Sequence, residues 1–164
     1  MRDIKLISAT AANIPLISAL ATKVWNQHYP GIIGQDQIDY MLGLMYSTES
    51  LLEQIEKKGH LFYLVSKGDT ITGFISVSRK SGRDLFLNKF YIDQAKSSMG
   101  IGSEALRLLI EELMPSKITL TVNRKNYKSV NFYFKNDFTI EKIADIDIGN
   151  GFVMNDFIMT WSES

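Results

Sequence analysis

The sequence predicts a single α/β (α+β) domain in which a mixed, mostly antiparallel central sheet is flanked by helices. Three observations lead to this prediction. Apolar residues recur at helical spacing over much of residues 10–59, they alternate with period two from about residue 60 to residue 92, and helix and strand patterns follow each other from residue 100 onwards. The length of 164 residues fits one hydrophobic core, so we expect one domain over residues 1–164.

The amino-terminal third is expected to hold one strand and three helices. Residues 4–8 alternate as a short strand, and Thr10 can cap a helix that carries the apolar residues of positions 14–24. Turn-forming residues at 25–31 are expected to end this helix in a loop that carries exposed aromatic side chains. Two further helices are predicted from apolar stripes at residues 38–45 and 51–55.

The middle of the chain has the period of β-strands. Turn signals at Lys67-Gly68-Asp69 and Ser81-Gly82-Arg83 separate three alternating segments, which we expect to form an antiparallel meander. The three predicted strands are residues 61–65, 71–77 and 85–92.

Helix and strand patterns alternate in the last third. The segment from Gly100 to Met114 has one apolar face and closes at Pro115, as expected of an amphipathic helix. The turn Ile148-Gly149-Asn150-Gly151 is a strong signal for a hairpin. The other predicted elements are a strand at 118–122, a helix at 126–135, and strands at 138–146 and 152–161.

Composition excludes several classes of function. Eighteen basic residues balance eighteen acidic ones, which argues against a nucleic-acid partner. The absence of cysteine excludes disulfides, thiolate metal sites and a cysteine nucleophile, and neither histidine has a spaced partner that would indicate a metal site. No apolar run is long enough for a membrane span or a signal peptide, so we expect a cytoplasmic protein with no membrane partner.

A candidate phosphate site follows the predicted strand 85–92. The segment Met99-Gly100-Ile101-Gly102 starts a long helix, whose first N–H groups are unpaired within the helix and carry partial positive charge. Glycine allows a phosphate to approach the backbone without a Cβ in the way. By itself, the pattern is equally consistent with a tight turn into a packed helix.

Two sequence motifs that follow each other along the chain make the prediction of a phosphate site more specific. Ser97 to Gly102 lies in the frame Gln/Arg-x-x-Gly-x-Gly/Ala, and the segment from Asn126 to Phe138 is similar to Asn-x-x-Ala-x-x-Phe-Tyr-x-Lys-x-Gly-Phe. On these residues the chain resembles the GNAT superfamily of N-acetyltransferases, and its fold is expected to be GNAT-like. The resemblance covers nearly the full length, including the closing strand with Asp156-Phe157-Ile158-Met159. Within the superfamily it looks most like the bacterial spermine/spermidine acetyltransferases of the Pai type.

The resemblance implies acetyl-CoA as the cofactor and assigns residues to it. The backbone of Phe90, Tyr91 and Ile92 is expected to pair with the pantetheine amides. Asn126 is expected to contact the pantetheine arm, although it would serve equally well as a helix N-cap. Lys135 is expected near a phosphate or in solvent. The complete set expected to bind the cofactor is Phe90, Tyr91, Ile92, Ser97, Ser98, Met99, Gly100, Ile101, Gly102, Ser103, Asn126, Ser129 and Lys135.

The sequence departs from the family at two places. Ser97 stands at the Gln/Arg position and Ser98 at a frequent glycine position, but the pyrophosphate contacts there are largely made by backbone N–H groups, so we expect binding to survive. Asn88 stands where many relatives place a glutamate that deprotonates the amine. The identity of the general base is therefore left open.

Acetyl transfer to an amine also needs an acid for the leaving thiolate. By the motif frame, Tyr133 is the candidate catalytic acid, the alternative being a core tyrosine beside Phe132. Trp25, His28 and Tyr29 are expected on the substrate side together with Asn88, either lining the pocket for a cationic amine or, for His28, acting as a base.

The favoured function is direct transfer of an acetyl group from acetyl-CoA to a primary amine of a small molecule in a ternary complex, with a polyamine as the preferred acceptor. The alternatives are a catalytically weak acyl-CoA sensor, which the asparagine at position 88 makes conceivable, or acetylation of amino acids or protein amino termini. A homodimer formed through Phe152, Val153 and Phe157 is a further hypothesis.

Overall fold

The computed structural model describes residues 3–93, 95 and 100–164. Ser97, Ser98 and Met99 of the predicted phosphate loop lie outside these described residues. The chain divides into two compact units: residues 1–78 and 88–114 form the first, and residues 79–87 and 115–164 form the second.

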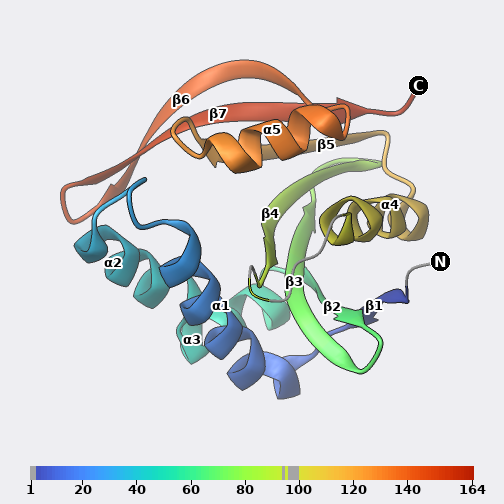
Figure 1. The fold of residues 1–164 in the computed structure, drawn as a ribbon, viewed down its shortest axis with the longest axis horizontal. Helices are drawn as coiled ribbons and strands as arrows, with labels where there is room; N and C mark the ends of the chain where they lie inside the picture. The colour runs from blue at the N-terminus through green and yellow to red at the C-terminus, as the bar shows by residue number, and fades with distance from the viewer. Residues whose placement is uncertain (1–2, 94, 96–99) are drawn as a thin grey trace. The chain divides into compact units, whose positions relative to one another are not determined.

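The first unit contains three strands, one half of a fourth, and four α-helices (Figure 1). Strand β2 pairs antiparallel with both β1 and β3. The apolar faces of these elements supply fully buried side chains such as Ile17, Leu51, Val65 and Phe74. The elements are β1 (Ile4–Ser8), the 3₁₀ turn η1 (Ala11–Asn13), α1 (Ile14–His28), α2 (Gln35–Tyr46), α3 (Thr48–Glu56), β2 (Leu61–Lys67), β3 (Thr70–Arg79), β4 (Asp84–Ile92) and α4 (Ile101–Leu113).

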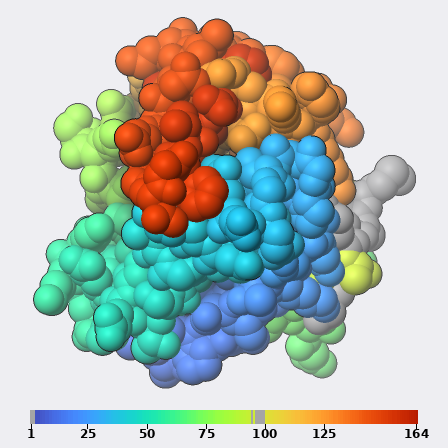
Figure 2. Space-filling model, turned by 90° about the vertical axis from the view of Figure 1, so that its left-hand side faces the viewer, coloured from blue at the N-terminus to red at the C-terminus, as the bar shows by residue number. Residues whose placement is uncertain are grey.

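Helices in this unit begin at residues whose side chains or backbone suit a helix start. The Thr10 side chain and that of Asn13 form a reciprocal capping box at η1, which leads into α1. Ser47 separates α2 from α3, and its hydroxyl accepts a hydrogen bond from the Ser50 N–H at 3.2 Å. Because only this one residue separates them, α2 and α3 lie against each other on the surface of the unit (Figure 2).

The second unit is built on a β-hairpin and one helix. Strands β6 (Thr139–Gly149) and β7 (Phe152–Ser162) pair antiparallel, and β7 also pairs antiparallel with β5 (Lys117–Asn123). The hairpin turns at Asn150 and Gly151, both with positive φ. This backbone suits an Asn-Gly turn, as the sequence predicted. Helix α5 (Tyr127–Lys135) contributes Val130 and Tyr133 to the buried residues.

Strand β4 supplies residues to both units, and the strands hydrogen-bond in the order β1-β2-β3-β4-β5-β7-β6. The pairing of β4 with β5 is parallel and joins Asp84–Phe86 to Lys117–Thr119, whereas β1, β2 and β3 and the strands β5, β7 and β6 are joined by antiparallel pairing. The mixed, mostly antiparallel sheet with flanking helices that the sequence predicted is therefore confirmed.

The expected loop at residues 25–31 is wrong in its first half. Helix α1 continues to His28, and Trp25 is 2% exposed rather than presented on a loop. The reason is that the apolar stripe of the helix continues through Ala21 and Trp25, four residues apart on one face. The helix ends only at the following turn, where Gly31 has a φ of +88°.

No α-helix among the described residues is both long enough and apolar enough to cross a membrane.

Candidate functional site

An aromatic cluster in the first unit joins the end of helix α1 to the end of strand β4. The rings of Trp25 and Tyr29 lie 4.3 Å apart, and the Trp25 ring lies 5.8 Å from that of Tyr91. The hydroxyl oxygens of Tyr29 and Tyr91 are 2.9 Å apart, which is a hydrogen bond. His28 stacks edge-on against Tyr29 at 5.1 Å. The structure thus brings together three residues predicted for the substrate side and one predicted for the cofactor.

The sequence did not single out Tyr46, which completes this cluster. Tyr46 is 2% exposed, its hydroxyl oxygen accepts a hydrogen bond from the Trp25 indole N–H at 3.4 Å, and its ring lies 5.9 Å from Phe74. Burial raises the pKa of Tyr46 above its usual value, so the phenol stays neutral. In the sequence, the only sign of this role is that Tyr46 is an aromatic residue at the carboxyl end of the apolar stripe of a predicted helix.

Glycine at position 73 allows β4 to approach β3 closely. A Cβ on Gly73 would lie 2.1 Å from the carbonyl oxygen of Tyr91 and 3.0 Å from the Cα of Ile92. Any side chain there would displace the backbone of the residues predicted to contact pantetheine. Gly73 therefore helps to set the position of the carboxyl end of β4.

Asp93 anchors the segment that leaves β4. It is 0% exposed, and it forms an ion pair of 2.8 Å with Lys23 and accepts hydrogen bonds from the Gln27 side chain at 3.2 Å and the Ala95 N–H at 3.0 Å. Burial acts to raise the pKa of Asp93, but these donors outweigh it and hold the pKa below the usual value. The charged carboxylate thereby ties α1 to the entrance of the predicted phosphate loop.

The start of α4 has the geometry expected of an anion site. Gly100 is the N-cap, with φ 88° and ψ 3°, a left-handed conformation that favours glycine. Ile101 is buried and fixes the first turn, while Gly102 and Ser103 are partly exposed. The acidic residue of the first turn, Glu104, is paired with Arg107 and so does not present an uncompensated charge. The described part of the predicted phosphate segment therefore fits a pyrophosphate.

Asn88 lies on β4 and is partly buried. The hydroxyl of Ser78 is 3.5 Å from its Oδ1, and its Nδ2 is buried without a hydrogen-bond partner among the described residues. An asparagine amide has no proton-accepting capacity comparable to a carboxylate at neutral pH. Asn88 therefore cannot act as the general base.

Phe90 lies on β4 in the first unit and is partly exposed, and the other predicted residues lie in the second unit. Asn126 is the N-cap of α5, is 3% exposed, and accepts the Ser129 N–H at 3.2 Å, so the capping alternative is confirmed. Tyr133 is 8% exposed, and its ring lies 5.3 Å from both Phe132 and Phe138. Lys135 is the last residue of the helix and is exposed.

The arrangement suits group transfer that uses side chains and backbone donors. Across the part of the chain that the structure describes, no group of three or more histidine, aspartate or glutamate side chains is placed to hold a metal ion. The first unit thus offers a helix start, a close-packed strand end and an aromatic cluster, and the second unit offers a buried tyrosine.

Known proteins match this chain in sequence over most of its length. The model of the acetyltransferase (GNAT) family matches residues 24–138. A spermidine N(1)-acetyltransferase of Thermoplasma acidophilum is 27% identical over 160 residues, which cover 93% of this chain and 96% of the relative.

Solved structures share the fold over nearly the whole chain. The crystal structure of the PaiA N-acetyltransferase of Thermoplasma acidophilum, in complex with coenzyme A, superposes with a TM-score of 0.79 at 23% identity and covers 98% of this chain and 99% of that one. An acetyltransferase of Thermus thermophilus superposes with a TM-score of 0.72 at 15% identity and covers 99% and 100%.

Proposed function

Since this chain belongs to the acetyltransferase (GNAT) family, we propose that it transfers the acetyl group of acetyl-CoA to a primary amine of a small molecule, with a polyamine as the preferred acceptor. The observation that carries the proposal is the strand β4 that leads to a Gly100-capped helix within the region matched by the family. One N-acetyltransferase domain over residues 1–164 is part of this proposal. The cytoplasmic location stays a prediction from the sequence.

Cofactor binding is proposed to use the residues that the sequence motifs assign. The N–H groups at the start of α4, from Gly100 to Ser103, would hold the pyrophosphate. The backbone of Phe90, Tyr91 and Ile92, at the end of β4, would pair with the pantetheine amides as an added strand. Asn126 would support the same arm while it caps α5.

The reaction needs two proton transfers beyond binding. When bound, acetyl-CoA supplies an activated acetyl thioester. The amine, with a pKa near 10.4 for a lysine-like alkylamine, must lose a proton before it attacks the thioester carbonyl. We assign Tyr133 as the group that donates a proton to the leaving sulfur. Its buried ring is fixed by Phe132 and Phe138, which would hold the hydroxyl in one direction.

The preference for a polyamine is supported by the relative named as a spermidine acetyltransferase. Tyr29 and Tyr91 of the aromatic cluster, which are partly exposed, add a physical reason, because aromatic faces attract alkylammonium groups. His28, at the edge of the cluster, is proposed as a lining residue of the acceptor site.

The proposal is tested by measuring thiol release from acetyl-CoA with spermidine, spermine, amino acids, an aminoglycoside and a peptide. We expect turnover with a polyamine, and a lower kcat with an altered pH profile in Tyr133→Phe. A protein that binds acetyl-CoA but turns over none of these amines would instead be the acyl-CoA sensor considered from the sequence. Preferred turnover of the peptide or an amino acid would overturn the polyamine preference alone.

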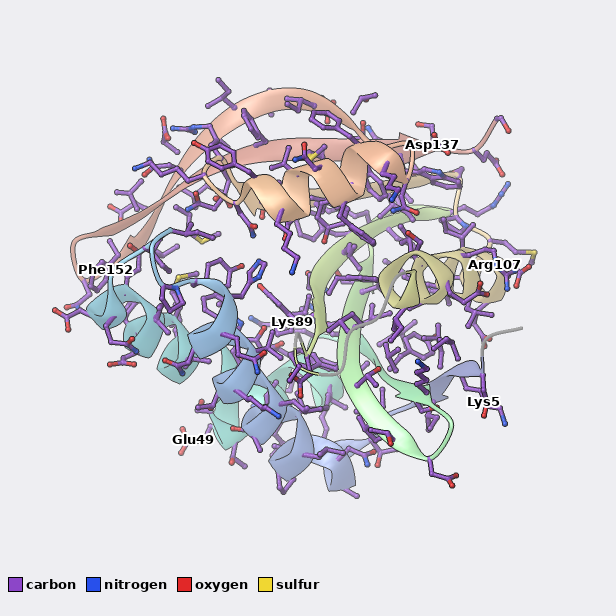
Figure 3. All side chains as sticks on the ribbon, in the orientation of Figure 1. Lys5, Glu49, Lys89, Arg107, Asp137 and Phe152 are labelled. Atoms are coloured by element: carbon purple, nitrogen blue, oxygen red, sulfur yellow. The ribbon has the colours of Figure 1, made fainter. Side chains whose placement is uncertain are left out.

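A homodimer is proposed through the hairpin of the second unit. Strand β6 ends the order of paired strands, and Ile143 on it is 62% exposed. Val153 at the hairpin end is 42% exposed, and Figure 3 shows Phe152 near the tip. An exposed apolar edge strand favours pairing with another chain. Light scattering coupled to size exclusion tests this: a monomer at micromolar concentration would reject it.

A further inference from the structure

The first unit buries one lysine that neither the sequence motifs nor the assigned site residues use. Lys89 lies on β4 and is 7% exposed (Figure 3). Its ammonium donates to Gln54 Oε1 at 2.8 Å and lies 5.0 Å from the centre of the Tyr46 ring. The Gln54 amide nitrogen donates to Met45 O at 2.8 Å and to Ser50 Oγ at 3.0 Å, which fixes the amide with its oxygen toward the lysine. An amide oxygen accepts a hydrogen bond from an amine as well as from an ammonium, so this contact holds the nitrogen in either protonation state.

The hydrogen bonds between β3 and β4 indicate an extra residue in β4. Toward the end of β4, the Asp93 N–H donates to Thr72 O at 2.7 Å. At the hairpin end of the same two strands, the Lys80 N–H donates to Asp84 O at 2.9 Å. Between these two bonds β3 advances by eight residues, from 72 to 80, and β4 by nine, from 84 to 93. One extra residue in one strand of an antiparallel pair is a β-bulge, at which two residues oppose one.

The extra residue brings Asn88 and Lys89 to the same face. Counted in steps of two from the first of these bonds, Lys89 is opposite Ser76, and counted from the second, Asn88 is opposite Ser76. The Ser78 hydroxyl is 3.5 Å from Asn88 Oδ1, which places Asn88 on the face of Ser76 and Ser78. Asn88 and Lys89 therefore oppose Ser76 together.

This face of the strands also carries the aromatic cluster. Phe74, two residues before Ser76, lies 5.9 Å from the Tyr46 ring, which is the ring that Lys89 contacts. The Phe74 ring also lies 5.7 Å from that of Tyr91. Lys89 and Tyr91 are thus two residues apart on one face, about 7 Å along the strand. Since Tyr91 belongs to the acceptor site proposed above, Lys89 lies beside that site.

Two polar groups next to Lys89 lack hydrogen-bond partners. Ser76 is 0% exposed, and its hydroxyl is buried without a partner among the described residues. The same holds for Nδ2 of Asn88, although Asn88 as a whole is partly exposed. Buried polar groups are nearly always satisfied, so these two mark the place of a water between the lysine and the partly exposed side of the site.

The groups that face Lys89 set its proton affinity. Burial is the largest influence and, with the charge of Lys58 after α3, lowers the pKa of Lys89 to about 8. Tyr46 on α2 stays neutral because burial raises its pKa. His60, before β2, is also neutral at this pH, because burial and the charges of Lys89 and Lys58 lower its pKa. A lysine amine tuned to this range suits a general base near neutral pH.

We propose that Lys89, in its neutral form, is the general base of the acetyl transfer and takes the proton of the acceptor ammonium through one water held by Ser76 and Asn88. This inference rests on the proposed function. The ammonium gives one proton to the water as the water gives one to Nζ of Lys89. The amine nitrogen then bonds to the acetyl carbon, the carbon–sulfur bond breaks, and the sulfur takes a proton from the acid assigned above. The nitrogen loses its second proton to solvent, from which the acid is reprotonated, and Lys89 returns its own proton to solvent.

The first test compares the wild type with Lys89→Met, which keeps the length of the side chain and removes the amine. The wild-type kcat/KM for a polyamine should rise with pH through a limb near pH 8, apart from the limb of the acceptor amine near pH 10. In Lys89→Met the limb near pH 8 should be absent, and kcat/KM at pH 8.5 should fall by about 100-fold or more, the lower end of general-base contributions. Acetyl-CoA binding and thermal unfolding report whether the variant is folded.

A second measurement does not depend on turnover. In protein with ¹³C-labelled lysine, the Lys89 Cε signal, assigned by its absence in Lys89→Met, should titrate near pH 8 with the midpoint of the kinetic limb. Lys58→Met removes a charge that lowers the pKa of Lys89, so the NMR midpoint and the kinetic limb should move together to higher pH. Lys57→Met, at the neighbouring exposed residue, is the matched control and should leave both in place. Ser76→Ala removes one group that holds the water and should lower kcat/KM.

The outcomes separate this inference from the proposed function. If the wild type acetylates an amine but folded Lys89→Met keeps the wild-type rate and the same limb, Lys89 is not the base. The same conclusion follows if Lys58→Met moves the NMR midpoint but not the kinetic limb, or if Lys89 titrates near 10.5 like an exposed lysine. An unchanged rate in Ser76→Ala would overturn the water path. A wild type that acetylates no amine contradicts the proposed function first.

Discussion

Substitution of Lys89 by methionine should change how the stability of the protein depends on pH. Lys89 lies on β4 and is 7% exposed (Figure 3). Its ammonium donates to Gln54 Oε1 at 2.8 Å and lies 5.0 Å from the centre of the Tyr46 ring. None of the ion pairs among the described residues includes Lys89. A buried cation with only neutral partners should destabilise the folded chain.

The size of the effect follows from the pKa. Burial, and secondarily the charge of Lys58, lowers the pKa of Lys89 from 10.5 to about 8. Each pKa unit corresponds to about 1.4 kcal/mol, so the protonated Lys89 costs the folded state roughly 3 kcal/mol at neutral pH. The pKa of Lys89 is lower in the folded protein than in the unfolded protein. The folded protein is therefore most stable above pH 10.5 and loses stability as the pH falls through 8. Between pH 9.5 and 6.5 the loss is about 2 kcal/mol.

The assay is chemical denaturation of the wild type and Lys89→Met at pH 6.5, 8 and 9.5. The wild type should lose about 2 kcal/mol of unfolding free energy relative to the variant between the highest and the lowest pH. Lys57→Met, at the exposed end of α3, is the control: it keeps Lys89, so its stability should change with pH as that of the wild type does. A difference between the wild type and Lys89→Met that stays constant within about 0.5 kcal/mol across this range would refute the reasoning.

Three further substitutions test other parts of the structure. Gly73→Ala places a Cβ 2.1 Å from the Tyr91 carbonyl oxygen, so β4 must move, and thermal unfolding should show a loss of about 3 kcal/mol together with weaker acetyl-CoA binding. Asn126→Ala removes the cap of α5 and should cost about 1–2 kcal/mol in chemical denaturation, whereas Asn126→Asp should cost less. Burial raises the pKa of Asp156 to about 6 in the folded protein, so the stability of the wild type should fall as the pH rises through about 6. Asp156→Asn removes this loss and should therefore be more stable than the wild type at pH 8 by up to about 3 kcal/mol, compared with the difference at pH 4. Unfolding of both proteins across this pH range measures the effect, and an equal pH dependence would contradict the raised pKa.

Local sequence signals were reliable where the interaction lies within a few residues. The capping role of Thr10, the hairpin turn at Asn150 and Gly151, and the cap at Asn126 were all predictable, because the partners lie two to four residues away. The same holds for Gly100, whose left-handed conformation starts α4. These features depend on backbone geometry that a short segment sets by itself.

The sequence by itself determined the family, the order of strands and helices, and the expected cofactor segment. Each of these follows from the spacing of apolar residues or from a contiguous sequence motif. Only the tertiary structure decided that Trp25 is buried in a cluster with Tyr46 and Tyr91, and that Lys89 and Asp156 lie in the interior. In the sequence these two charged residues look like ordinary polar positions of strands. Burial depends on what elements distant in the chain place around a side chain, and the pKa of a group follows from that surrounding rather than from its neighbours in sequence.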